Sequence, residues 1–431
     1  MTIPRGGLAL WTNVCRLLLA VVFILSGFVK AIDPLGTQYK IEDYLEAFHM
    51  SGMLPDWVLL VLSVAQSAVE FILGVFLLFA IRRKMTSRVV LFIMAVMTPL
   101  TLWLALADPI SDCGCFGDAV KLTNWQTFGK NVVLLAAAIV VARWRTKMFR
   151  IISESNQWIV INYSSLFVLA TSIYCLYALP LFDFRPYHVG TDLRTGWSEM
   201  MEGKESPYAD FFMERVGDYE DVTDSLLGDT GYVFLLVAPY LEVADDSRLD
   251  LINELYEYAK QHRYPFYGVT SSGEKAIAHW REITGAEYEF CLTDGTVLKT
   301  VIRSNPGLVL LKDGVIIRKW SHNMLPELDD MQTPLPLEQV EIGSLPNDTV
   351  AERILRLIMW FVLPLALLSI ADRIWMWSRW VKKKRQRTLE RLKLLQIEQM
   401  LKEEKEEEES EEENSEQSEN PESSEKSENK V

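Results

Sequence analysis

Cysteine and histidine are scarce in this sequence, with five of each among 431 residues. Two of the cysteines, Cys113 and Cys115, stand one residue apart in the stretch DPISDCGCFGD, and no histidine is close to them in the sequence. Structural zinc sites usually take their ligands from two separated pairs of residues. The sequence has no second cysteine pair to complement this one, which disfavours a zinc site of that kind.

Charged residues are rare in six long apolar runs, which cover about residues 14–32, 57–81, 89–107, 128–144, 157–182 and 353–372. A helix that crosses a membrane needs roughly 20 mostly apolar residues. We therefore expect six transmembrane helices, of which the first four form a compact four-helix bundle over residues 1–150. Because further spans follow the first run, we expect it to remain as a helix rather than to be cleaved as a signal peptide.

Lysine and arginine are few in the loops after the first and third runs, whereas the loops after the second and fourth runs read RRKMTSR and RWRTKMFR. Basic loops lie on the cytoplasmic side of a membrane. This pattern predicts an inner-membrane protein with both termini in the cytoplasm. The Cys113–Cys115 loop and the polar residues 183–347 then face the periplasm.

Aromatic residues are absent from residues 403–431, where glutamate and serine dominate. Such a segment cannot bury enough apolar surface to offset the entropy of ordering, so we expect a disordered acidic tail. The preceding residues 373–402 have leucines at helical spacing and predict a cytoplasmic juxtamembrane helix. Much of the net charge of −15 lies in the tail, and we expect no nucleic acid among the partners.

Residues 183–347 combine strand and helix patterns. Apolar strands are expected near residues 231–238 and 264–270, each followed by a helix, and the stretch TVLKTVIRSNPGLVLLKDGVIIRKW is expected to supply the last strands. Its Asp313-Gly314 dipeptide is a strong hairpin signal. The fold class is thus an α-helical integral membrane protein, with a four-helix bundle, two further spans and an extracytoplasmic α/β domain.

This α/β segment resembles the thioredoxin fold over about residues 228–325, in particular its membrane-anchored TlpA-like branch. The resemblance makes Pro306, in SNPGLVLLKDG, the counterpart of the cis-proline that contacts peptide backbones. The loop in which that family carries Cys-X-X-Cys reads APYLEVADD here and has no thiol. We therefore predict that this domain binds a client and performs no redox chemistry of its own. Cys291 is interpreted as a small buried hydrophobe.

The first four runs resemble the DoxX/MauE superfamily of four-helix membrane proteins over about residues 10–145. The resemblance rests on the stretches SGFVKAIDPLGTQYKIEDYL, AQSAVEFILGVFLLF and DCGCFGD. MauE-type members are associated with maturation of a disulfide-rich periplasmic subunit, and DoxX-type members with quinone-linked thiosulfate oxidation. The matching positions that the resemblance implies for a site are Lys30, Asp33, Glu70, Cys113 and Cys115.

The chemistry of the cysteine pair has three interpretations. Two residues span at most about 7 Å between Cα atoms, and a disulfide needs roughly 4.4–6.8 Å, so a turn at Gly114 makes a bridge feasible. Closing so short a loop stabilises the fold little, which favours an exchanging disulfide over a structural one. The alternatives are a metal held by both thiolates with Asp112 or Asp118, and an unreactive turn. Copper(I), a soft ion, would suit the two thiolates better than zinc.

Glu70 lies about midway along the second run, where an isolated carboxylate costs roughly 2.5–3.5 kcal/mol to insert. Ser26 and Lys30 in the first run are its expected partners. A role in proton or quinone chemistry competes with a packing role, and quinone is the one candidate cofactor.

Two functions remain open. The first is an inner-membrane thiol-disulfide or quinone-linked redox protein, whose Cys113–Cys115 pair serves an envelope client held by the α/β domain. The second is a non-enzymatic scaffold or maturation partner for an envelope protein. Membrane lipid is an expected partner in both. A transporter is disfavoured, because the sequence lacks paired, interrupted helices in repeated halves.

Overall fold

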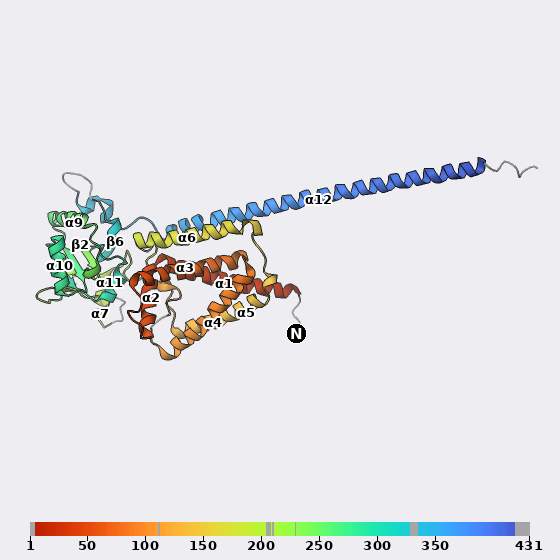
Figure 1. The fold of residues 1–431 in the computed structure, drawn as a ribbon. Coiled ribbons are helices and arrows are strands. Elements are labelled where there is room, and N and C mark those ends of the chain that lie inside the picture. Colours follow the sequence, from red (N-terminus) through yellow and green to blue (C-terminus); the bar gives the residue numbers. More distant parts are fainter. Residues whose placement is uncertain are drawn as a thin grey trace, which may run out of the picture. The chain divides into compact units, whose positions relative to one another are not determined.

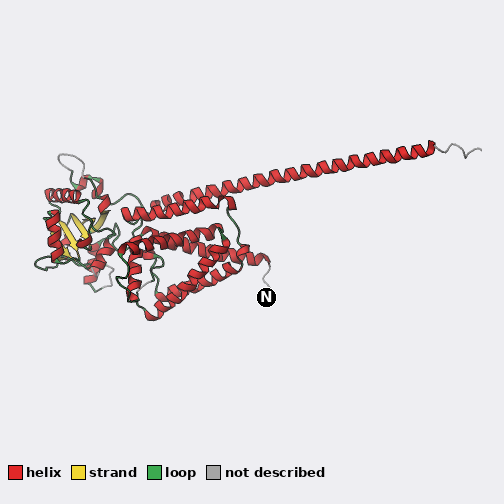
Figure 2. Cartoon of the chain, viewed as in Figure 1, coloured by secondary structure: helices red, strands yellow, loops and turns green. Residues whose placement is uncertain are grey.

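The computed structural model of this protein describes residues 5–110, 113–203, 208, 211–228, 230–327 and 335–418. Helices make up most of the described chain, and the strands gather in one sheet (Figure 2). The chain divides into two units, residues 1–364 and residues 365–431. The first unit contains both the helical bundle and the domain built on the sheet, called the sheet domain below.

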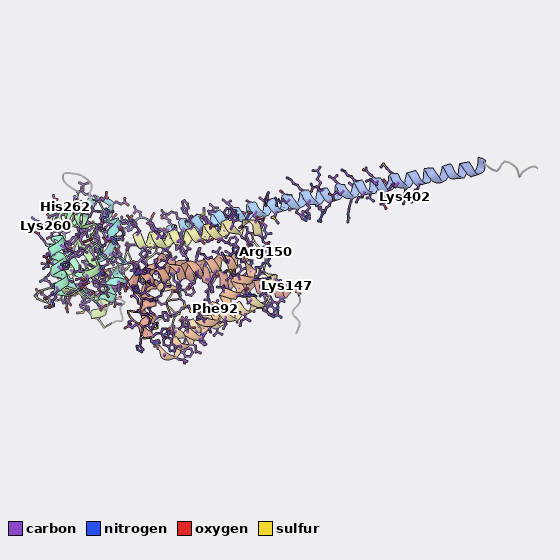
Figure 3. The ribbon with its side chains drawn as sticks, viewed as in Figure 1. Phe92, Lys147, Arg150, Lys260, His262 and Lys402 are labelled. Atoms are coloured by element: carbon purple, nitrogen blue, oxygen red, sulfur yellow. The ribbon has the colours of Figure 1, made fainter. Side chains whose placement is uncertain are left out.

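Six helices are long and apolar enough to cross a membrane, in agreement with the six predicted spans. Large apolar side chains on their outer faces are exposed, such as Phe92, which is 69% exposed (Figure 3). Exposed apolar surface of this extent suits contact with lipid. The six are α1 (Arg5–Ile32), α3 (Asp56–Phe79), α4 (Arg83–Ala107), α5 (Asn124–Arg143), α6 (Gln157–Tyr177) and α12 (Val350–Ser418).

Helices α1, α3, α4 and α5 share one apolar core. Helices α1 and α3 cross closely, because a Cβ atom on Gly27 would lie 2.3 Å from the backbone nitrogen of Phe71. A Cβ atom on Gly74 would likewise lie 2.6 Å from the nitrogen of Ile24. Small residues permit such close backbone contact between membrane helices. The crossing brings the polar residues of α1 and α3 together. The core comprises Leu19, Phe23, Leu77, Met94, Leu134 and Val141, among others.

A short helix, α2 (Pro34–Ala47), follows α1 and was not expected from the sequence. Asp33 is its N-cap, and the carboxylate accepts a hydrogen bond of 2.9 Å from the backbone N–H of Gly36. Pro34 occupies the first helical position, where its missing N–H has no cost. The Asp-Pro pair therefore ends α1 and begins α2 in a new direction.

The α5–α6 connection is bound to the N-terminal half of α1 and to the start of α4. Arg16 donates to the carbonyl of Phe149 at 2.5 Å, and Arg83 donates to the carbonyl of Met148 at 3.0 Å. Figure 3 shows Lys147 and Arg150 together at this end of the bundle. The basic loops expected on one side of the membrane thus share one end of the bundle.

The sheet domain contains a six-stranded mixed sheet in the order β1-β4-β3-β2-β5-β6. β2 pairs in parallel with β3, and β3 with β4, whereas the β2–β5, β5–β6 and β1–β4 pairs are antiparallel. All seven residues of central β2 are buried, as expected of a strand covered on both faces. The strands are β1 (Glu214–Arg215), β2 (Tyr232–Ala238), β3 (Phe266–Thr270), β4 (Glu289–Leu292), β5 (Gly307–Lys312) and β6 (Val315–Ser321).

Helices cover both faces of this sheet (Figure 1). α9 (Leu249–His262) and α10 (Glu274–Thr284) pack on the face that carries Phe234 and Leu236. The opposite face packs against α7 (Leu193–Met201), α8 (Thr223–Gly228) and α11 (Gly295–Val301). Short 3-10 turns lie at Gly117–Ala119, Arg145–Lys147, Glu154–Asn156, Leu241–Val243, His322–Met324, Leu337–Gln339 and Glu341–Gly343.

The hairpin predicted at Asp313-Gly314 is confirmed, because β5 and β6 pair antiparallel around these residues, both of which have positive φ. The expectation of a strand in TVLKTV is wrong: these residues belong to α11. Asp294 caps that helix by accepting hydrogen bonds from the N–H groups of Thr296 and Val297. This cap overrides the β preference of the valines and threonines. The Asn305–Pro306 peptide bond is cis.

The tail also departs from expectation. α12 continues to Ser418, so residues 403–418 are helical where we expected disorder, and residues 419–431 lie outside the described residues. Glutamate, glutamine and lysine are strong helix formers, and no proline occurs between Pro364 and Pro421. Low apolar content excludes a packed core but does not exclude a helix.

Candidate functional site

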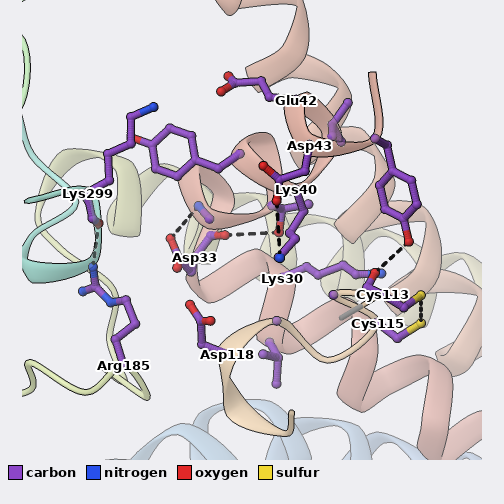
Figure 4. A pocket seen from close by; sticks show the side chains of 18 of the residues that line it. Lys30, Asp33, Lys40, Glu42, Asp43, Cys113, Cys115, Asp118, Arg185 and Lys299 are labelled. Carbon is purple, nitrogen blue, oxygen red and sulfur yellow. Dashed lines mark hydrogen bonds and ion pairs between the residues drawn. The ribbon is translucent and has the colours of Figure 1, made fainter. Parts of the chain in front are cut away.

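A cavity of about 740 Å³ opens beside the cysteine pair (Figure 4). Its walls come from the end of α1, from α2, from the loop at residues 113–118 and from α11 of the sheet domain. Among the residues predicted for a site, Lys30, Asp33, Cys113, Cys115 and Asp118 line it. The fold therefore collects on one cavity residues that are far apart in the sequence.

The two sulfur atoms of the pair lie 2.8 Å apart. Gly114, with φ of +65°, makes the turn that aims both side chains to the same side. A disulfide bond is about 2.05 Å long, so the loop holds the sulfurs close enough to join with little movement. Cys113 is buried and Cys115 is partly buried. Asp112 lies outside the described residues.

The two thiols are not equivalent. The hydrogen bond from Cys113 lowers the pKa of Cys115 to about 6; burial opposes this, and the cations Lys130 and Lys30 assist it. The same hydrogen bond raises the pKa of Cys113, and burial raises it further. These opposite shifts favour Cys115 as the thiolate of the pair and Cys113 as the thiol that stays protonated. A thiolate is the nucleophile in cysteine chemistry, so the lowered pKa favours attack by Cys115.

Side chains from two helices hold the backbone of this loop. The Tyr44 hydroxyl of α2 donates to the carbonyl of Cys113 at 3.1 Å. The Ser26 hydroxyl of α1 lies 2.6 Å from the carbonyl oxygen of Cys115. The side chain of Lys40 covers Gly114, because a Cβ atom there would lie 3.0 Å from Cγ of Lys40. The pair is therefore fixed from both sides.

Glu70 contacts both partners expected for it. Its carboxylate lies 2.7 Å and 2.8 Å from Nζ of Lys30, and 2.7 Å from the Ser26 hydroxyl. Gln66, one turn earlier on α3, donates to it at 3.3 Å. Lys30 is only 6% exposed, so the two opposite charges compensate each other inside the bundle. Ser26 links this ion pair to the loop of Cys115.

Arg303, just after α11, binds two more of the predicted acids. Its guanidinium lies 3.0 Å from Oδ2 of Asp33 and 3.3 Å from Oδ2 of Asp118. Although burial opposes it, the attraction of Asp33, Tyr39 and Asp118 holds the pKa of Arg303 above its usual value. The ring of Tyr39 also lies under the guanidinium, 5.2 Å from its carbon atom. The sheet domain is thereby bound to the bundle beside the cysteine pair.

Sequence reasoning missed Arg303, Tyr44 and Lys130. Arg303 precedes Pro306 by three residues, and nothing local to it indicates that its partners Asp33 and Asp118 lie 270 and 185 residues away. Tyr44 could have been found, because the Asp33-Pro34 capping signal predicts α2, on which it lies. Lys130 lies 4.5 Å above the ring of Phe116, a contact that only the folded loop creates.

Pro306 does not line this cavity. It lies beside the APYLEVADD loop, where the Asn305 side-chain amide donates to the carbonyl of Tyr240 at 2.8 Å. The other cysteines are dispersed. Cys291 is fully buried in β4, and burial raises its pKa to about 12, as fits an inert packing residue.

Metal binding has little support in the described part of the chain. No group of three or more histidine, cysteine, aspartate or glutamate side chains there is arranged to hold a metal ion. Asp118, one of the acids considered as a ligand, is instead bound to Arg303. The two thiols have each other as hydrogen-bond partners.

Residues 8–143 match the family described as methylamine utilisation protein MauE. The match covers the bundle and the cysteine loop, and it supports the resemblance expected from the sequence for this part of the chain. No curated protein and no solved structure matches the chain. Together with the six apolar helices, the family match indicates a multi-pass membrane protein.

Proposed function

We propose that this MauE-matching bundle exchanges a disulfide between Cys113–Cys115 and a client protein of the cell envelope. The observation that carries the proposal is the placement of two sulfurs 2.8 Å apart on a cavity wall, with Cys113 buried and the pKa of Cys115 lowered by its partner and by the charges of Lys130 and Lys30. A purely structural turn does not require this asymmetry. Both lie on the wall of a cavity, where a ligand can reach them.

The exchange has two steps. The Cys115 thiolate attacks one sulfur of a client disulfide, so that a mixed disulfide forms and the second client sulfur leaves as a thiolate. Cys113 passes its proton to that thiolate and attacks the sulfur of Cys115, which closes the Cys113–Cys115 bond and releases the client. The client gains two electrons and the pair loses two; the reverse sequence oxidises a client dithiol.

We further propose that the pair faces the periplasm. Support comes from the basic residues in the α3–α4 and α5–α6 connections, whose loops belong in the cytoplasm by the positive-inside rule. The cysteine loop joins α4 to α5 and lies on the other side in this topology. An oxidising compartment is where disulfides form and persist.

The sheet domain is proposed as a thioredoxin-like module that presents the client. Its alternation of strands and helices, closed by the β5–β6 hairpin, supports this assignment. The absence of a thiol from the APYLEVADD loop supports binding rather than catalysis. In this division, the sheet domain binds and the bundle performs the exchange.

The test uses full-length protein in native membranes with Cys15, Cys175 and Cys291 changed to Ser. Free thiols are blocked, disulfides are reduced, and newly exposed thiols receive a mass-tagging maleimide. We expect the pair to be partly oxidised and to titrate with added thiol–disulfide buffers. If both thiols remain free under oxidising conditions, the exchange function is wrong and the non-enzymatic scaffold becomes the better description.

A further inference from the structure

The cavity restricts what can reach the cysteine pair. Cys113 is 8% exposed, and both cysteines lie on the wall of the 740 Å³ space rather than on a protruding loop. Cavities of about 300–1,000 Å³ typically enclose most of a bound ligand. A disulfide on the surface of a rigid, folded protein cannot enter such a space. A reactant must therefore be small or be an extended segment of chain.

The charged side chains on the walls largely have partners within the protein. Lys30 pairs with Glu70, Arg303 with Asp33 and Asp118, and Lys40 lies 3.3 Å from Asp43. A site for a small anionic ligand is expected to offer cations for it to neutralise. Because these cations already face acids, the walls do not select strongly for a charged small molecule.

Lys299 follows the same pattern with aromatic partners. Its ammonium lies 4.5 Å from the centre of the Tyr39 ring and 5.1 Å from that of Tyr240. A cation held over aromatic faces is partly compensated without a counter-ion. An acidic ligand would therefore gain less by pairing with Lys299.

Apolar side chains occupy much of the remaining wall. Ile41 and Leu45 come from α2, and Phe182 and Phe184 come from the segment that follows α6. Phe184 is 44% exposed. Apolar walls interrupted by paired charges suit a polypeptide of mixed composition, since its side chains gain from leaving water while its backbone finds polar neighbours.

We infer that the cavity between α2, the Cys113–Cys115 loop and α11 admits an extended, cysteine-bearing segment of a client polypeptide, and that folded disulfide proteins are excluded. The inference rests on the proposed exchange function and names its substrate class. The bundle and the sheet domain each form part of the same cavity, so both contact the segment. The client is then a chain that has not completed its folding.

The experiment measures attack by Cys115 on three probes, each a mixed disulfide between thionitrobenzoate, a chromogenic leaving group, and the single thiol of a carrier. The three carriers are cysteamine, a short unstructured peptide with one cysteine, and a folded domain with one cysteine. Attack forms a bond from the Cys115 sulfur to the probe sulfur and releases thionitrobenzoate, whose absorbance gives the rate. The protein is the full chain in detergent, with Cys15, Cys175 and Cys291 changed to Ser.

Thr296→Trp is the blocking variant, because Thr296 lines the cavity yet is exposed, so the protein accommodates a larger side chain. We expect Thr296→Trp to lower the rate of reaction with the peptide probe by about tenfold or more, while the rate with the cysteamine probe is unchanged. Thr300→Phe, one turn later on the same wall, is the second blocking variant. Ile283→Trp is the matched control, since Ile283 is exposed on α10 of the sheet domain and does not line the cavity.

The outcomes separate this inference from the exchange function. If the cysteamine probe fails to react, the exchange function itself is wrong. If cysteamine reacts but both blocking variants leave the peptide rate unchanged, the cavity is not the route of the client. A folded-domain probe that reacts as fast as the peptide overturns the inference as well, whereas a much slower one supports it.

Discussion

The Arg303 guanidinium lies 3.0 Å from a carboxylate oxygen of Asp33, although 270 positions separate the two residues. Asp33 has a second task, because the same carboxylate caps α2. Arg303 also contacts Asp118, just after the cysteine pair. One arginine of the sheet domain thus binds both the start of α2 and the loop that carries the thiols.

Arg303→Leu is expected to loosen the sheet domain from the bundle. The change leaves Asp33 and Asp118 without their cation in a largely buried place, and breaking such a pair costs about 3 kcal/mol or more. Hydrogen–deuterium exchange should rise at residues 34–37 and 113–119. Arg318→Leu is the control, because Arg318 also lies in the sheet domain but contacts Glu341 and Ser344 there. Equal exchange in the two variants would contradict the role of Arg303.

A second prediction concerns the contribution of the Lys30–Glu70 ion pair to stability. Lys30→Met leaves the Glu70 carboxylate buried and uncompensated, which costs about 3–5 kcal/mol when a buried pair is broken. The double variant Lys30→Met, Glu70→Met should recover most of that loss, because two apolar residues can replace a buried pair. Thermal unfolding of the purified protein in detergent measures both. A double variant as unstable as the single one would show that another contact of these residues dominates.

Much of the architecture could be predicted because its signals are local. Six apolar runs predicted six helices, and Asp313-Gly314 predicted the β5–β6 hairpin, whose two turn residues have positive φ. Glu70 and Lys30 could be paired in advance, since a buried carboxylate in a membrane helix requires a partner and few polar residues are available.

The rest depended on contacts that no short stretch encodes. Arg303 finds its partners only when the sheet domain meets the bundle. The residues of α11 favour strands, and their helix depends on the Asp294 cap. For residues 403–418 the composition was misleading. It excludes a packed core, but the helix propensity of these residues still orders the backbone as a helix.

Cys291 should remain unmodified in the folded protein. It is fully buried in β4, and burial raises its pKa to about 12, so almost no thiolate is present at neutral pH. Brief treatment with maleimide followed by peptide mass mapping should label Cys115 and spare Cys291, and denaturation should equalise the two. Labelling of Cys291 at the rate of Cys115 in the native state would contradict its placement in the sheet.

The pH dependence of Cys115 reactivity tests the asymmetry of the pair. Only the thiolate reacts, and the hydrogen bond from Cys113 lowers the pKa of Cys115 from its usual 9.0 to about 6. Below that pH, the alkylation rate should fall about tenfold per pH unit, as protonation removes the nucleophile. Above it, the rate should level off instead of continuing to rise toward pH 9. Alkylation by iodoacetamide, with Cys15, Cys175 and Cys291 changed to Ser, gives the profile.

Two substitutions at Cys113 identify the cause of this shift. Cys113→Ala removes the hydrogen-bond donor, so burial should raise the pKa of Cys115 and move the plateau to higher pH. Cys113→Ser keeps a hydroxyl that can donate a hydrogen bond. The pH at which its alkylation rate levels off should therefore lie between the values for the Ala variant and the parent. Lys130→Met, which removes an attracting cation, should also move the plateau upward. Identical profiles for the Ala variant and the parent would show that Cys113 does not activate Cys115, and the exchange mechanism would then lose its nucleophile.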